Sequence, residues 1–193
     1  DSSPATTAAA GSRDNTPVVL TGSADGTVTY GNDSVTVDAS HTEEGYLMVS
    51  YSGSNSKVKL QITGSDEITY TYNLHDGYET FPLTSGSGSY TVGVFENIEG
   101  TSYSTLFTQA IDVTIQDEFG PYLYANQYVN FSADSKVISK AMELSASAND
   151  DLEVIENVYN YIITNFTYDY DKAASVQSGY LPDVDDVLAS QTG

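Results

Sequence analysis

The sequence predicts a mainly β protein of the α+β class, with an immunoglobulin-like β-sandwich followed by two or three helices. The first observation is a series of short runs between Val18 and about Ile115 that are rich in Val, Ile, Thr, Tyr and Phe. Gly, Asn, Asp and Ser separate these runs, as is typical of an antiparallel sandwich or barrel. The second observation is a change to helical periodicity after the stretch QDEFGPYLYANQYVNFS, which begins at Gln116 and ends at Ser132. The third is a length of 193 residues, which is enough to bury a core.

Alternation within the strand runs supports the sandwich. In KVKLQIT, Val58, Leu60 and Ile62 fall on one face of the expected strand, and the residues between them are polar. Tyr90 and Val92 alternate in the same way in GSYTVGVFEN. A strand with one buried face has this period of two. Antibody domains have a Cys-Trp-Cys core, and this chain has no Cys and no Trp, so the prediction concerns the architecture alone.

Two later segments carry apolar residues at helical spacing, which predicts two amphipathic helices. The positions are 4, 3 and 4 apart in the first segment and 3, 4, 3 and 4 apart in the second: Val137, Ala141, Leu144 and Ala148, then Leu152, Ile155, Tyr159, Ile162 and Phe166. The short stretch ASAND between them predicts antiparallel packing.

Small polar residues are placed to cap these helices, because their side chains accept hydrogen bonds from the free N–H groups of a first turn. The expected caps are Ser132 or Asp134 for the first helix, Asn149 or Asp150 for the second, and Asp183 for a third short helix ending at Gly193.

These patterns predict three parts: a flexible linker over residues 1–17, the sandwich over 18–116 and the helical segment over 117–193. The helical segment has no predicted sheet and is small for a core of its own. It is therefore expected either to pack on the sandwich or to be the front portion of a larger domain.

Charge excludes several functions. The chain has 27 acidic and 6 basic residues and a net charge of -21, which disfavours nucleic acid and anionic membrane surfaces. No long apolar run is present, so no membrane insertion is expected. The polar start at Asp1 and the Lys-poor, Ser/Thr/Tyr-rich composition predict an exported, extracellular or cell-surface bacterial protein whose signal peptide has been removed.

The stretch DDLEVIENVYNYIITNFTYDYDKA, followed by GYLPDVDDVLASQTG, resembles the beginning of a transglutaminase-like domain. In that family an amphipathic helix ends in an Asn-aromatic-x-Tyr-Asp-like stretch, and a later short helix ends at a Gly next to the nucleophilic Cys. The matching positions are Tyr159, Ile162, Asn165, Phe166, Tyr168 and Asp169 in the first block, and Leu181, Pro182, Leu188, Ser190, Thr192 and Gly193 in the second.

The resemblance implies a Cys almost directly after Gly193, with a His and an Asp further on. Because none of the 193 residues is a Cys, no catalytic, cofactor-binding or metal-binding residue is assigned within them. The chain is interpreted as an inactive fragment of a secreted or cell-surface cysteine enzyme. The parent would hydrolyse or transfer amides of peptides or proteins, including those of the cell envelope. The alternative is a non-catalytic adhesion or binding module with a helical tail.

Three other groups of residues were weighed as sites. His41 and His75, with Glu43 or Asp76 as partners, are interpreted as surface or turn histidines, because no metal-ligand spacing and no GxSxG motif is present.

Two acidic groups, Asp169 with Asp171 and Asp183 with Asp185 and Asp186, are interpreted as helix caps or solvated charge, with calcium binding as the alternative. Five tyrosines are expected to bury the junction between sandwich and helices, with stacking on carbohydrate or peptide as the alternative: Tyr122, Tyr124, Tyr128, Tyr168 and Tyr170.

Overall fold

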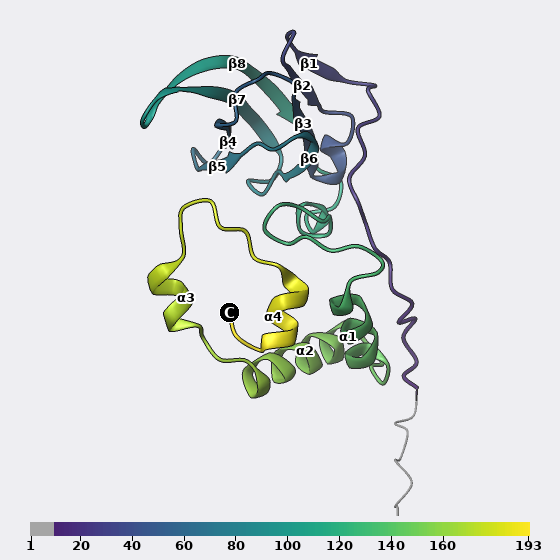
Figure 1. Ribbon diagram of the computed structural model, residues 1–193. Helices are drawn as coiled ribbons and strands as arrows, with labels where there is room; N and C mark the ends of the chain where they lie inside the picture. Colours follow the sequence, from purple (N-terminus) through teal and green to yellow (C-terminus); the bar gives the residue numbers. More distant parts are fainter. Residues whose placement is uncertain (1–9) are drawn as a thin grey trace, which may run out of the picture. The chain divides into compact units, whose positions relative to one another are not determined.

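The computed structural model describes residues 10–193 and divides the chain into two units (Figure 1). One unit is Leu20–Tyr128 and contains all eight strands of the described chain. The other unit combines the chain up to Val19 with Val129–Gly193 and contains four helices. The strand unit is therefore inserted between two segments that belong to the helical unit.

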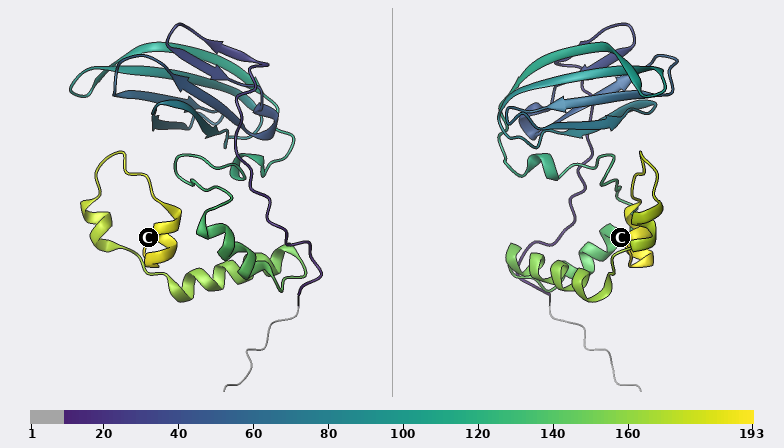
Figure 2. Two further views of the ribbon diagram at one scale, coloured as in Figure 1. Left: turned by 45° about the vertical axis from the view of Figure 1, so that its right-hand side comes forward. Right: turned by 90° about the vertical axis from the view of Figure 1, so that its left-hand side faces the viewer.

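Two antiparallel four-stranded sheets build the strand unit. Figure 2 shows the strands of this unit from two sides. The first sheet has the order β1-β2-β3-β6, with β1 at Thr29–Gly31, β2 at Val35–Asp38, β3 at Tyr46–Tyr51 and β6 at Gly77–Pro82. The second has the order β5-β4-β7-β8, with β4 at Val58–Thr63, β5 at Thr69–Asn73, β7 at Gly88–Glu99 and β8 at Ser102–Val113.

Apolar side chains from both sheets meet in one core, which confirms the predicted β-sandwich. Leu60 and Phe81, from opposite sheets, have no exposed side-chain surface. The predicted alternation in β4 is also confirmed, because Val58, Leu60 and Ile62 are buried and the residues between them are half-buried.

The strand unit continues beyond residue 116, where the sequence placed the end of the sandwich. The 3-10 helix η2 (Gly120–Tyr122) and the chain after it pack back onto the sandwich. The ring of Tyr124 lies 4.4 Å from the ring of Tyr46, and Ala125 N–H donates to Leu20 at 3.3 Å. These contacts hold the segment up to Tyr128 in the strand unit although it has no strand periodicity.

Four helices form the helical unit: α1 (Lys136–Ser145), α2 (Asp151–Asn165), α3 (Tyr170–Ser175) and α4 (Val184–Ser190). The two amphipathic helices expected from the sequence correspond to α1 and α2, and the short helix after Asp183 to α4. Helix α3 lies where the sequence predicted only a polar loop. No helix within residues 10–193 is long and apolar enough to cross a membrane.

The helix caps follow the sequence at α2 and α4 and differ at α1. Asp150 accepts from Glu153 N–H at 2.9 Å, and Asp183 accepts from the N–H groups of the first turn of α4. Helix α1 is not capped by Ser132 or Asp134. Its first two N–H groups donate to the carboxylate of Asp185 at 2.9 and 3.0 Å, so a residue of α4 caps α1.

The end of α4 also differs from the expectation at Gly193. Gln191 is the C-terminal cap, with a left-handed backbone at φ 53°, and its N–H donates to the carbonyl of Val187 at 3.0 Å. Gly193 is two residues further on, in extended backbone pairing.

The N-terminal segment is attached to the helical unit within the residues that the structure describes. Gly11 N–H donates to the carbonyl of Ala146 at 3.0 Å, and Arg13 forms an ion pair of 2.7 Å with Asp151. Ser12 donates to Asn149. The linker predicted over residues 1–17 lies partly outside the described residues, but its segment from Gly11 to Asn15 follows the loop between α1 and α2.

Replacing Leu60 with Ala is expected to destabilise the sandwich by about 2–5 kcal/mol, because it removes a fully buried side chain and leaves a cavity. Urea unfolding measures this loss. The control is Thr71→Ala on β5, whose side chain is exposed and should change stability by less than about 0.5 kcal/mol. Equal losses in both variants would contradict the position of the core.

Candidate functional site in the helical unit

An open apolar groove of about 660 Å³ lies between α1, α2 and α4. Its lining is almost entirely apolar, and Lys140 is the one charged residue in it. The principal lining residues are Val137, Ala141 and Leu144 from α1, Val158, Ile162, Ile163 and Phe166 from α2, and Pro182, Val184, Val187 and Leu188 on and before α4. Pockets of this volume and polarity are the usual form of a ligand or partner site.

The groove is open because the helical unit buries very little of its own apolar surface. Among the described residues of this unit, only Ser145 and Ala148 are buried. Along the predicted apolar stripe of α2, Leu152 is 74% exposed, Ile155 63% and Ile162 49%. An amphipathic helix owes most of its stability to packing of its apolar face, and within the described residues the apolar face of α2 is largely exposed.

Lys140 is held along the side of the groove by two interactions. Its ammonium group lies 2.5 Å from the carboxylate of Glu143 and 5.1 Å from the centre of the Tyr161 ring. The hydrogen bond and charge of Glu143 raise the pKa of Lys140, so this side chain is a cation at neutral pH. Its aliphatic part lines apolar surface while its charge stays at the rim.

At one end of the groove, two segments far apart in the sequence are joined by a short parallel bridge between Thr167 and Thr192. Thr167 N–H donates to Gln191 at 3.0 Å, Gly193 N–H donates to Thr167 at 3.1 Å, and Asp169 N–H donates to Gly193 at 3.2 Å. The bridge fixes the backbone of Gly193, which belongs to the groove lining.

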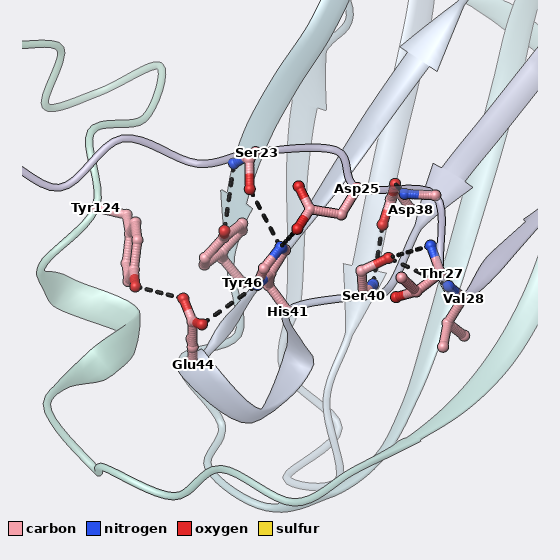
Figure 3. Close-up of polar contacts among 11 residues, drawn as sticks. Ser23, Asp25, Thr27, Val28, Asp38, Ser40, His41, Glu44, Tyr46 and Tyr124 are labelled. Atoms are coloured by element: carbon pink, nitrogen blue, oxygen red, sulfur yellow. Dashed lines mark hydrogen bonds and ion pairs between the residues drawn. The ribbon is translucent and has the colours of Figure 1, made fainter.

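A second polar cluster centres on His41 in the strand unit (Figure 3). Its Nε2 lies 3.1 Å from both the hydroxyl of Ser23 and the carboxylate of Asp25, and its Nδ1 lies 3.3 Å from the carboxylate of Glu44. The imidazole stacks on the ring of Tyr46 at 5.3 Å. Four segments meet here: the chain before β1, the 3-10 helix η1 (Thr42–Glu44), the start of β3 and, through Tyr124, the chain after η2.

The electrostatics of this cluster favour a charged histidine. Burial lowers the pKa of His41, but the hydrogen bonds and charges of Glu44 and Asp25 outweigh it, and the net pKa is raised. Burial and the hydrogen bond to Glu44 together raise the pKa of Tyr124, so its hydroxyl stays a donor. Beside the cluster, the hydrogen bonds from Ser40 and Gly26 outweigh burial and lower the pKa of Asp38.

Ser23, His41 and Glu44 are connected in the order of a catalytic triad. The charges around the imidazole instead favour a structural role, in which His41 is held between carboxylates, and we call this arrangement the His41 clamp. A general base must be neutral to take the proton of a serine, and the raised pKa of His41 extends the pH range over which its imidazole is protonated. Nε2 also faces Asp25 as well as the hydroxyl of Ser23. The cluster therefore joins the edge segments of the sandwich by charge.

The other histidine and its expected partners take no part in this cluster. His75 Nδ1 lies 3.0 Å from Glu79, and Gln127 donates to the same carboxylate at 2.7 Å. Glu43 binds Gln116, and Asp76 forms an isolated bridge with Tyr51. Within the described residues, no group of three His, Cys, Asp or Glu side chains is placed to hold a metal ion.

Three of the weighed aspartates are helix caps. Asp169 accepts from Lys172 N–H at 2.8 Å and caps α3, Asp183 caps α4, and Asp185 caps α1. Asp169 and Asp183 each use one carboxylate oxygen for backbone N–H groups, and Asp185 uses both. The sequence indicated capping by Asp183, but the cap between helices by Asp185 has no local signal.

The five weighed tyrosines have different surroundings. Tyr124 packs on Tyr46, and Tyr128 packs on Tyr72 at 5.9 Å. Tyr122 is 66% exposed in the strand unit. Tyr168 and Tyr170, exposed in the helical unit, lie edge to face at 4.8 Å.

No family model matches the chain, and no curated protein matches it. Among solved structures, the chain is similar to the fn3 domain of the human collagen alpha-1(XX) chain, with 16% identity and a TM-score of 0.34 over 49% of this chain and 92% of that one. Domains of that type share the sandwich architecture of the immunoglobulin fold.

The groove should bind an uncharged apolar dye such as Nile red. An anionic dye is unsuitable because the chain carries a net charge of -21. Replacing Ile163, 58% exposed in the lining, with Asn should remove most of the fluorescence enhancement. The matched control is Leu152→Asn, on the same helix and 74% exposed but outside the lining. Equal dye binding by both variants would contradict a site in the groove.

The His41 clamp should make stability depend on pH. Because the folded pKa is raised above the unfolded value of about 6.5, the stabilisation is fully present below that pH and is lost as the pH rises through the folded pKa. The measurement is the difference in unfolding free energy between wild type and His41→Asn from about pH 6 to about pH 8.5. This difference should shrink with rising pH, and Glu44→Gln should reduce it. A difference independent of pH would contradict the clamp.

Proposed function

We propose that the helical unit is the first part of a transglutaminase-like cysteine-enzyme domain and that the sandwich is its accessory module. The complete enzyme would be exported or attached to the cell surface and would act on amide groups of peptides or proteins. Hydrolysis and acyl transfer both proceed through a thioester on a Cys. This chain has no Cys, so it supplies a wall of the domain and no nucleophile.

The observation that carries the proposal is the bridge between Thr167 and Thr192. The two blocks that resemble the family lie on opposite sides of α3 and its flanking loops in the sequence, and they meet in space through three backbone hydrogen bonds. The resemblance rests on residue types and their order alone, so the contact between the two blocks is an independent observation. Paired blocks of this kind support a common origin of the two motifs in one site.

The open groove supports the same proposal. A lining of Val, Leu, Ile and Phe side chains normally faces further protein, because exposed apolar patches of this extent are rare on soluble monomers. Gly193 lies in the lining, so residues joined to it would start beside the groove. A thiol there would need a helix N-terminus or a neighbouring cation to lower its pKa, and those groups would belong to the remainder of the domain.

The decisive experiment is peptide mapping of the protein isolated from its natural source. Lys172 is the last basic residue of the sequence, so trypsin should release a peptide that begins at Ala173 and runs past Gly193. Before digestion, the native protein is treated with iodoacetamide at about pH 6, where an ordinary Cys with a pKa of about 8.5 is largely protonated. The proposal predicts an alkylated Cys almost directly after Gly193.

Two controls make the result specific. Prior unfolding in urea should abolish labelling at about pH 6, because an activated thiol needs the folded site. Substitution of the labelled Cys by Ser in recombinant full-length protein should abolish amide hydrolysis or transfer. A peptide that continues without Cys into another strand-rich module, or into an anchoring segment, would contradict the enzyme and support the adhesion module.

A further inference from the structure

A second hollow, of about 460 Å³, lies in the sandwich unit and combines polar and aromatic walls. Residues 84–87, in the turn between β6 and β7, form one wall, and residues 115–122, which follow β8, form the other. The volume falls within the range of about 300–1,000 Å³ that is typical of small-molecule sites. The hollow lies within Leu20–Tyr128 and shares no residue with the groove of the helical unit.

Two aromatic rings stand at this hollow on a rigid support. Phe119 is 64% exposed and Tyr122 is 66% exposed, whereas Gly120 and Pro121 between them are buried. A Cβ atom on Gly120 would lie 2.4 Å from the carbonyl oxygen of Glu44, and one on Gly45, at φ 90°, would lie 2.5 Å from the ring of Pro121. The backbone of the buried pair is closely packed, and it carries the two exposed rings on either side of it.

The polar wall is also fixed in place. Gln116 bonds to Glu43 twice, through its backbone N–H at 2.9 Å and its side-chain amide at 2.7 Å. The hydroxyl of Ser87 accepts from Ile115 N–H at 2.9 Å. Asp117 accepts from Phe119 N–H at 3.0 Å. The bond between Ser87 and Ile115 joins the two walls of the hollow, and the other bonds order the wall formed by residues 115–122, which lowers the ordering cost of binding.

Two polar groups at the hollow keep their hydrogen-bonding capacity for a ligand. Within the described part of the chain, the carboxylate of Glu118 and the hydroxyl of Thr84 form no hydrogen bond with protein atoms. Asp117 uses one carboxylate oxygen for Phe119 and has its second oxygen unused among the described residues. The hollow therefore offers carboxylate acceptors and a hydroxyl beside two exposed rings.

We propose that this hollow binds a neutral saccharide, an activity that goes beyond the proposed enzyme. A pyranose has an apolar C–H face that packs on an aromatic ring, and hydroxyl groups that donate to carboxylates at its edge. Phe119 and Tyr122 supply the rings, and Glu118 and Asp117 supply the acceptors. A net charge of -21 and two carboxylates at the site exclude uronic-acid and sulfated sugars. The stacking role that the sequence left open for Tyr122 is thus assigned to it together with Phe119, which the sequence did not single out.

Calorimetric titration of the full chain with cellotetraose, chitotetraose and tetragalacturonic acid tests the proposal. At least one of the two neutral tetrasaccharides should bind, and the anionic one should not. Tyr122→Ala and Phe119→Ala should each weaken the binding by about tenfold or more, and Glu118→Gln should weaken it as well. The matched control is Tyr70→Ala, an exposed ring on β5 outside the hollow, which should leave the affinity unchanged.

A second measurement guards against variants that fail to fold. Amide shifts of the isotope-labelled wild-type chain, recorded during titration with the same tetrasaccharides, should change at residues 84–87 and 115–122. Absence of binding by both neutral sugars, shifts confined to other residues, or equal loss of affinity in Tyr70→Ala would overturn the proposal. None of these results depends on the cysteine enzyme, which is tested by peptide mapping.

Discussion

Burial of apolar side chains between the two sheets is the constraint on which the strand unit depends. Strands β4 and β7 place alternate Val, Leu, Ile and Tyr side chains against Phe81 and its neighbours from the other sheet. Once this core is formed, segments outside the sheets pack against its ends. The buried Gly120 and Pro121 close one end, and the His41 cluster ties together segments that lie outside the sheets. Both features need the sandwich to hold their parts in position.

The helical unit shows what happens where such a core is lacking. Helices α1, α2 and α4 have good caps and clear apolar faces, but among the described residues of the unit only Ser145 and Ala148 are buried. Its order comes instead from polar ties across the sequence. Asp185 caps α1, the segment from Gly11 to Asn15 holds the loop between α1 and α2, and Thr167 pairs with Thr192. Such ties fix geometry without covering apolar surface, so the groove remains open.

Much of the local structure was predictable because it depends on neighbouring residues. Alternation identified the buried face of β4, spacing of three and four identified α1 and α2, and Asp150 and Asp183 were recognisable as caps. The failures share one cause. The cap of α1 and the attachment of residues 116–128 to the sandwich depend on partners distant in the sequence. No local pattern marks such partners.

The sequence by itself determined the β-sandwich followed by helices, the positions of α1, α2 and α4, the excess of negative charge and the lack of a thiol nucleophile in this chain. These properties follow from composition and period, which act through backbone geometry and solvation. Only the tertiary structure decided which side chains meet. It joined the two blocks around Thr167 and Thr192, gathered Ser23, Asp25 and Glu44 around His41, and set Phe119 and Tyr122 on a buried support. The physical reason is that these contacts depend on how the chain closes in space, and loop closure between distant residues leaves no signature in the residues themselves.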